Sequence, residues 1–192
     1  MLFRSFTAPE KPVYVAVDNT YMGPLWSHPL KHGADLVIYS ATKYIGGHSD
    51  VIAGAVLGNN QLMTRIKTMR TFMGNMMSPW TGWLLLRSLE TLKPRMELQA
   101  QNAIKVAEFL REHPKVEKVY YLGFIEEGSG QYAIYRNQYL SPGAMLSFDV
   151  VGGEKEAFLF LNNLQLIKLA VDRKSTRLNS SHSTLSRMPS SA

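Results

Sequence analysis

Short runs of consecutive apolar residues punctuate the N-terminal third of the chain. The runs VYVAV (13–17) and LVIY (36–39) are rich in β-branched and aromatic residues, which is typical of central parallel strands buried on both faces. Residues 21–34 between them are long enough for a crossover, with Pro24 suited to a first helical turn and Gly33 to a helix end. The pattern predicts a βαβ unit.

Another strand and a helix are predicted next. The run VIAGAVL (51–57) is again apolar and predicts a third strand. Apolar residues at Leu62, Ile66 and Met69 follow at helical spacing and predict a helix over residues 59–74.

Prolines divide the segment after this helix. Ser78 and Pro79 form a break, and WTGWLLLRSLETL then predicts a helix that is broken or kinked before Pro94. A long amphipathic helix follows, which His113 and Pro114 close.

The character of the chain changes beyond Pro114. The runs VEKVYYL (116–122) and GAMLSFDVV (143–151) flank a loop that contains EEGSGQ, and EKEAFLFLNNL (154–164) predicts a helix before a final apolar run. This alternation predicts a smaller α/β layer, and the fold class of the whole is α/β. We predict a domain boundary near Arg95, so that residues 1–95 form part of a large domain and residues 96–171 part of a small one.

Residues 172–192 have no hydrophobic period and are rich in Ser and Arg, a composition typical of a disordered basic tail. There is a second interpretation. DRKSTRLNSSH and SRMPSSA back-translate into codons that resemble the two constant parts of a sequencing-library adapter, with STL in the place of a sample index. We therefore expect a non-native tail and exclude it from the functional argument.

The charge and composition narrow the functional classes. Half of the net charge of +6 lies in residues 172–192, and the rest of the chain has no arginine cluster or aromatic-basic interleaving, so we expect no nucleic-acid partner. No window approaches the apolar length of a membrane span, and the N-terminus lacks the apolar core of a signal peptide. With no cysteine, the chain has no disulfide or thiolate metal site, and we expect a cytoplasmic protein without a membrane partner.

Polar clusters follow the first two predicted strands. Asp18-Asn19-Thr20 comes after VYVAV, and Ser40-Ala41-Thr42-Lys43 after LVIY, at the strand ends where open α/β sheets bind ligands. In an extended segment Ser40 and Thr42 point to one side and Lys43 to the other. Hydroxyls suit a phosphate, an amine suits an aldehyde, and the Asp18 carboxylate suits a protonated ring nitrogen. Together they describe pyridoxal phosphate, although a lysine at a strand end is more often a solvated charge.

The run VDNTYMGPLWSHPLKHGADLVIYSATKYIGGHSD closely resembles the cofactor-lysine region of the cystathionine γ-synthase, cystathionine lyase and methionine γ-lyase family, which has the aspartate-aminotransferase-like fold (PLP fold type I). The similarity continues through SPWTGWLLLRSLETL, HPKVEKVYY, SPGAMLSFDV and LQLIKLAV, over roughly residues 12–171. One departure is Ser88, where many relatives have glycine.

The resemblance implies a role for each residue of the cluster. Lys43 is the lysine that binds the cofactor covalently and transfers protons, Asp18 keeps the pyridinium protonated, and Ser40 and Thr42 bind the phosphate. It also implies an enzyme that breaks a C–S bond in a sulfur amino acid, or makes one by replacing the γ-substituent of a homoserine ester, and a homotetramer built from dimers.

The family's phosphate loop, ring-stacking tyrosine and carboxylate-binding arginine have no counterpart in the chain, so we expect an inactive fragment with an uncovered sheet face and strand edge. The alternatives are a non-catalytic remnant with a structural or interaction role, and a basic nucleic-acid-binding module.

His28 and His32 have metal-like spacing, but Pro29 lies between them and a third ligand is lacking, so we expect no metal. We expect a structural role for His48.

Overall fold

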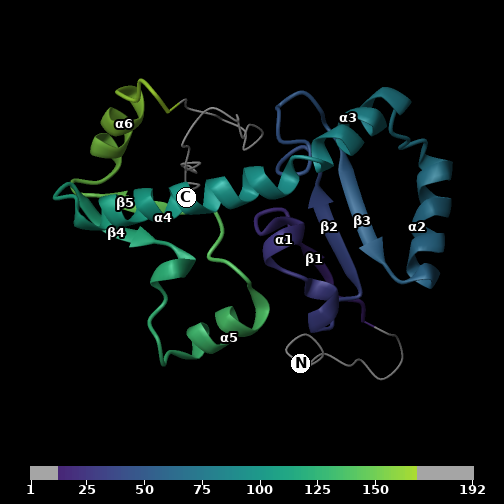
Figure 1. Ribbon diagram of the computed structural model, residues 1–192, viewed down its shortest axis with the longest axis horizontal. Helices are drawn as coiled ribbons and strands as arrows, with labels where there is room; N and C mark the ends of the chain where they lie inside the picture. Colours follow the sequence, from purple (N-terminus) through teal and green to yellow (C-terminus); the bar gives the residue numbers. More distant parts are fainter. Residues whose placement is uncertain (1–12, 168–192) are drawn as a thin grey trace.

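The computed structural model describes residues 13–167 and contains two separate β-sheets joined by a long helix (Figure 1). The first sheet lies in the N-terminal half and the second in the C-terminal half. The predicted tail, residues 172–192, lies outside the described residues.

The first sheet has the strand order β1-β2-β3, with β1 at Ala16–Asp18, β2 at Leu36–Ser40 and β3 at Gly54–Gly58. Strand β1 pairs with β2 in parallel, which confirms the predicted βαβ unit, and β3 pairs with β2 in the antiparallel direction. The crossover consists of the helix α1 (Gly23–Trp26) and the 3-10 helix η1 (Pro29–His32).

The expectation that the first two strands are buried on both faces is wrong for this chain. In β2, Val37 and Tyr39 are buried, but Ile38 on the opposite face is 38% exposed. In β1, Ala16 and Asp18 are exposed. One face of the sheet therefore carries no covering layer among residues 13–167, as the small number of predicted strands led us to expect.

Three helices connect the two sheets, and side-chain caps begin two of them. Helix α2 (Asn60–Met73) begins at Asn59, whose side chain accepts a hydrogen bond from the Leu62 N–H, and ends at Gly74 in the left-handed region. Helix α3 (Pro79–Leu89) is capped by the Ser78 hydroxyl. Helix α4 (Leu92–Glu112) has Pro94 in its first turn, where a missing N–H costs no helical hydrogen bond.

The second sheet is an antiparallel pair of β4 (Val116–Tyr120) and β5 (Ser147–Val150). The 3-10 helix η2 (Leu122–Phe124) and helix α5 (Gly130–Gln138) lie between these strands, and α6 (Glu154–Asn162) follows them. The sequence pattern did not predict α5, which begins inside the segment assigned to a loop.

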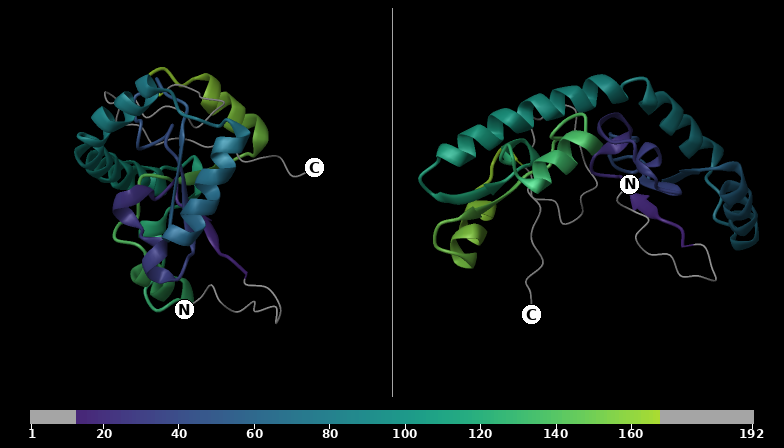
Figure 2. Two further views of the ribbon diagram at one scale, coloured as in Figure 1. Left: turned by 90° about the vertical axis from the view of Figure 1, so that its right-hand side faces the viewer. Right: turned by 90° about the horizontal axis from the view of Figure 1, so that it is seen from below.

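Helix α4 forms an arc along one side of the molecule, and both sheets lie on the same side of it (Figure 2). Its inward stripe supplies much of the core, and its Met96 is fully buried. Members of this core cluster include Trp26, Tyr44, Leu92, Ala100, Ala103, Ala107, Leu110, Tyr121 and Leu146. The helix runs unbroken through Arg95, where we place the domain boundary, so the division stays a prediction. No helix within residues 13–167 is long and apolar enough to cross a bilayer.

Candidate active site

The two predicted polar clusters meet at one edge of the first sheet. Strands β1 and β2 run in parallel with Asp18 opposite Ile38, and the Asn19 N–H donates a hydrogen bond to the Ile38 carbonyl at 2.9 Å. The carboxyl ends of both strands therefore lie side by side, which brings Asp18 and Ser40 to the same edge.

Thr20, to which the sequence argument gave no role, connects the two clusters. Its hydroxyl donates to the Asp18 carboxylate and accepts the Ser40 N–H at 2.8 Å. Its own N–H donates to the same Asp18 oxygen at 3.0 Å. This is the local turn that an aspartate makes with the residue two positions further along the chain. The Asp-Asn-Thr triplet in the sequence could therefore have predicted this hydrogen bond.

Asn19 fixes the start of the crossover through hydrogen bonds of its buried side chain. It is 5% exposed, and its side-chain amide donates to the carbonyls of Gly23 and Ser27 and to the Tyr39 hydroxyl. Because these partners lie in and after α1 and in β2, the amide ties the crossover to the strand beside Asp18.

The chain does not continue as an extended segment after Ser40, and that expectation is wrong. The Lys43 N–H donates to the Ser40 carbonyl at 3.1 Å, and the Gly46 and Gly47 N–H groups donate to the carbonyls of Ala41 and Lys43, each at 2.7 Å. These successive turns replace the strand ladder. Gly47 adopts a φ of 72°, which favours glycine. Lys43 is half-buried within this turn.

Thr42 is buried, and its hydroxyl bonds the backbone of Ala53 in both directions. It accepts the Ala53 N–H at 3.0 Å and donates to the Ala53 carbonyl at 3.3 Å. A hydroxyl has one proton to donate, so binding a phosphate requires Thr42 to turn that proton away from Ala53. The accepted bond can persist because a hydroxyl accepts independently of where it donates.

Tyr44 turns into the core next to Lys43. Its ring is 6% exposed and packs edge-on against Trp26, with the ring centroids 5.6 Å apart. Burial raises the pKa of the Tyr44 hydroxyl, so the side chain stays neutral. The lysine is thus followed immediately by a large buried anchor.

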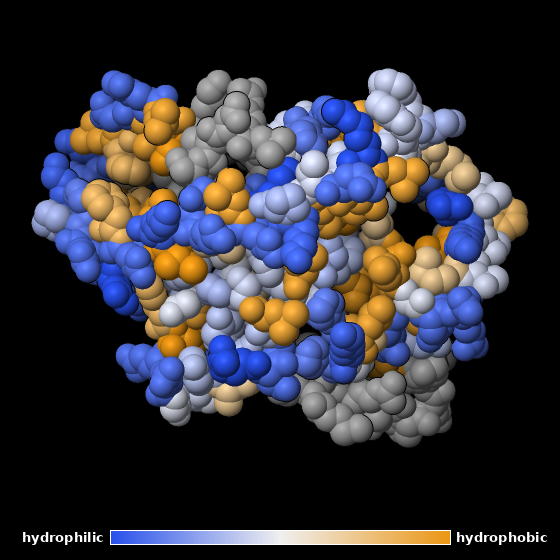
Figure 3. All heavy atoms as spheres, in the orientation of Figure 1, coloured by the Kyte–Doolittle hydropathy of each residue, from blue (hydrophilic) through white to orange (hydrophobic). Residues whose placement is uncertain are grey.

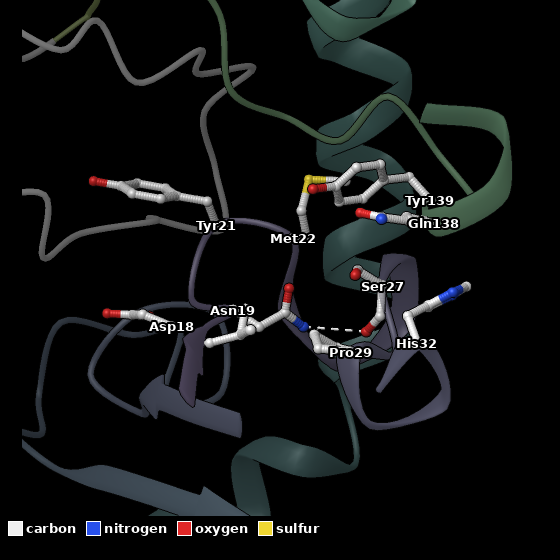
Figure 4. A pocket seen from close by; sticks show the side chains of 10 residues that line it. Asp18, Asn19, Tyr21, Met22, Ser27, Pro29, His32, Gln138 and Tyr139 are labelled. Atoms are coloured by element: carbon white, nitrogen blue, oxygen red, sulfur yellow. Dashed lines mark hydrogen bonds between the residues drawn. The ribbon is translucent and has the colours of Figure 1, made fainter. Parts of the chain in front are cut away.

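A pocket of about 210 Å³ lies beside this edge (Figure 4), and Ser40, Thr42 and Lys43 are not among the residues that line it. Asp18 borders it, while its side chain points away from Ser27 and His32 in the figure. The other lining residues are Val17, Asn19, Tyr21, Met22, Pro29, Gln138 and Tyr139.

The histidines have ordinary structural surroundings. His48 is exposed, and its Nδ1 lies 2.6 Å from the Gly46 carbonyl oxygen and 3.4 Å from the Ser88 hydroxyl. Within residues 13–167, no group of three or more His, Cys, Asp or Glu side chains could hold a metal ion, and this includes the neighbourhoods of His28 and His32.

The residues present fit pyridoxal phosphate. An amine, a carboxylate and two hydroxyls, from Lys43, Asp18, Ser40 and Thr42, lie at or directly after the carboxyl ends of two adjacent parallel strands. The Thr20 bridge between Asp18 and the Ser40 backbone holds the two strand ends together. These side chains are the ones that a pyridinium nitrogen, a phosphate and an aldehyde require.

Comparison with known proteins supplies independent evidence. The L-methionine gamma-lyase of Porphyromonas gingivalis is 45% identical over 161 residues, which are 83% of this chain and 40% of that protein. The cystathionine gamma-lyase of Bacillus subtilis is 41% identical over 82% of this chain and 41% of its own length. The crystal structure of cystathionine gamma synthase from Xanthomonas oryzae, in complex with aminoacrylate and cysteine, matches with a TM-score of 0.76 and 38% identity over 82% of this chain and 40% of that one.

These matches confirm the predicted fold, the aspartate-aminotransferase-like α/β fold of PLP fold type I. The chain spans about 40% of the length of the curated relatives that it matches. The model of one family, described as Cys/Met metabolism PLP-dependent enzyme, matches residues 5–177, which is most of the chain. The chain therefore belongs to the family of Cys/Met metabolism PLP-dependent enzymes.

Proposed function

We propose that the full-length protein is a pyridoxal-phosphate-dependent lyase or transferase that makes or breaks a C–S bond in a sulfur amino acid. The observation that carries the proposal is the position of Lys43 in a turn directly after β2, beside the linked pair of Asp18 and Ser40 at the neighbouring strand ends. The names of the relatives, which are lyases of methionine and cystathionine, support the substrate class.

Each residue has a defined part in this proposal. Lys43 would hold the cofactor through its amine and move protons at the substrate's Cα and Cβ. Asp18 holds the proton on the ring nitrogen, and Ser40 and Thr42 donate hydrogen bonds to the phosphate. When bound, pyridoxal phosphate supplies the electron sink that stabilises negative charge at the substrate's Cα.

The chain leaves the exact reaction open between elimination and replacement, and the substrate between a sulfur amino acid and a homoserine ester. One relative, from Pseudomonas aeruginosa, is named an O-succinylhomoserine sulfhydrylase, at 36% identity over 90% of this chain. For the full-length protein we propose a cytoplasmic homotetramer built from dimers. We propose no nucleic-acid or membrane partner.

Borohydride reduction of the full-length protein with bound pyridoxal phosphate, followed by peptide mapping, tests the assignment. We expect the pyridoxyl group on Lys43 and its complete loss in Lys43→Arg. Lys31→Arg is the control, because Lys31 is an exposed lysine in the 3-10 helix η1 and its replacement should leave the labelling unchanged. A label on another lysine would contradict the assignment. Absence of any label would favour a non-catalytic remnant.

A further inference from the structure

Arg95 is a charged residue buried in the first turn of α4. It is 4% exposed, and within residues 13–167 the hydrogen-bond partners of its guanidinium are three backbone carbonyls and the Thr91 hydroxyl, all of them neutral. Burial lowers the pKa of Arg95. A buried charge without a counter-charge is costly, and an apolar residue of similar volume is often at least as stable in such a place. A role in packing alone therefore does not account for an arginine here.

The guanidinium bonds connect the turn after Lys43 to the end of α3. Nη1 donates to the Tyr44 carbonyl at 2.8 Å, and Nη2 donates to the Ser88 carbonyl at 3.0 Å and, at 3.5 Å, to the Ile45 carbonyl. Tyr44 and Ile45 are the two residues that directly follow Lys43. The fixed fork of an arginine can hold several acceptors in defined directions at once.

Gly47 completes this contact from the other side. A Cβ atom at Gly47 would collide with the guanidinium of Arg95, so only a residue without a side chain allows the turn to lie against it. The Gly47 N–H in turn donates to the Lys43 carbonyl at 2.7 Å. Arg95 thus touches the turn at Tyr44, Ile45 and Gly47, and the turn closes back on Lys43.

We propose that Arg95 is a positioning residue for Lys43, which holds the main chain of residues 44–47 so that the lysine amine meets the cofactor at one fixed place. Arg95 acts through the turn and does not touch substrate or cofactor. A lysine that would hold the cofactor and move protons at the substrate needs a main chain that stays still, because misplacement by about 1 Å can cost two orders of magnitude in rate. This inference rests on the proposed function.

The first test compares Arg95→Met and Arg95→Lys with Leu110→Ala in the full-length protein. Leu110 lies in the same helix as Arg95 and, like Tyr44, in the core cluster, but far along α4 from the turn, so its truncation loosens the core without touching residues 44–47. We expect Arg95→Met to raise the apparent dissociation constant for pyridoxal phosphate about tenfold and to lower the labelling of Lys43. Arg95→Lys should recover only part of the loss, and Leu110→Ala should keep wild-type labelling despite a lower melting temperature.

Hydrogen exchange gives a second measurement that needs no cofactor. In Arg95→Met, the amides of Gly46 and Gly47 should exchange faster than in the wild type, because their hydrogen bonds close the turn. In Leu110→Ala these amides should keep their wild-type protection. If both variants lost the same melting temperature and also raised the exchange rates of these amides equally, the positioning role would be overturned. Wild-type exchange rates in Arg95→Met would overturn it as well.

Gly47→Ala tests the contact from the opposite side, and Gly74→Ala is its matched control. Both glycines have a φ of 72°, but nothing lies within 4 Å of a Cβ at Gly74. The two variants therefore share the backbone strain and differ in the collision with Arg95. We expect Gly47→Ala, but not Gly74→Ala, to weaken the labelling of Lys43. In the double variant with Arg95→Met, Gly47→Ala should reduce the labelling little further. Full additivity would contradict a shared contact. A wild-type protein that is not labelled at Lys43 would contradict the proposed function, and with it the purpose assigned to Arg95.

Discussion

Thr42 stands between two partners, the backbone of Ala53 in the structure and the phosphate in the proposed enzyme. Its hydroxyl accepts the Ala53 N–H at 3.0 Å and donates to the Ala53 carbonyl at the longer distance of 3.3 Å. The longer bond is the weaker one, so the proton is the part of this contact that can be redirected. The accepted bond keeps the turn joined to the start of β3 in both arrangements.

Thr42→Val separates these two contributions. Valine keeps the shape of threonine but leaves the Ala53 N–H without its acceptor, so we expect the free energy of unfolding to fall by about 1–3 kcal/mol. Affinity for pyridoxal phosphate should also fall, because one phosphate donor is lost. Thr42→Ser is the control that keeps the hydroxyl, and it should lose little affinity. Denaturant unfolding and cofactor titration measure the two effects. An affinity that is equal in Thr42→Val and wild type would exclude Thr42 from the phosphate site.

Among the elements, strand β2 and helices α2 to α4 were predictable because their signals are local. Strand β2 contains the continuous apolar run LVIY (36–39), and α2 begins and ends at a capping asparagine and a glycine. Strand β1 is displaced from the predicted run 13–17, because it exists only where it pairs with β2, at Ala16–Asp18. Helix α5 escaped prediction since its half-buried side consists of Tyr132, Tyr135 and Gln138 and not of aliphatic residues, although Ser129 caps it.

The candidate site was predictable to a similar extent. The strand ends carrying Asp18 and Ser40 follow from the βαβ pattern, while the role of Lys43 as the cofactor lysine comes from the resemblance of the motif and stays a prediction. The contact of Arg95 with the turn was not predictable, because Arg95 lies 51 residues from its partner Tyr44 along the chain. No local pattern joins them, and only the packing of α4 against the turn brings them together.

Tyr121 connects the end of β4 to the segment before β5, and this contact predicts a pH dependence. Its buried hydroxyl donates to the Gly143 carbonyl at 3.1 Å, and burial, with smaller contributions from Tyr135 and Glu108, raises its pKa from 10.0 to about 12. A raised pKa means that the folded state holds the proton more tightly than the unfolded state. The resulting stability is fully present below pH 10 and is lost as the pH rises through about 12.

We therefore expect Tyr121→Phe to flatten the alkaline part of the stability curve. At neutral pH the variant should lose about 1 kcal/mol with the hydrogen bond. Above the ordinary tyrosine pKa the wild type loses up to about 1.4 kcal/mol per pH unit through this group, and the variant does not. Denaturant unfolding of the full-length protein at a series of pH values measures both slopes. Parallel curves through this window would contradict the assignment.

At the scale of the whole molecule, α4 places two sheets on one side of a single helix, and the core follows that helix. Two surfaces lie outside this core. One is the face of β2 opposite Val37 and Tyr39, and the other is an apolar face formed by exposed residues of α2, α3 and the segment between them. Apolar residues form several patches among polar ones on both halves of this view, and one of the patches lies over β2 and β3 (Figure 3). Trp80 and Trp83 stack on each other at 4.9 Å while remaining 67% and 50% exposed. The remaining exposed residues of this apolar face include Met69, Phe72, Met73, Met76, Met77 and Leu86.

Exposed apolar area of this extent predicts association. We expect the 192-residue chain, produced by itself, to form large assemblies in size-exclusion chromatography with light scattering, and to release no α-keto acid from methionine or cystathionine. Phe72→Lys with Trp80→Lys should shift it toward smaller species, because both side chains lie on the apolar face. Thr64→Lys with Thr68→Lys adds the same charge at exposed polar positions of α2, so any shift beyond this control reflects the apolar face. A monodisperse and active wild-type chain would contradict the prediction, as would equal improvement by both pairs of substitutions.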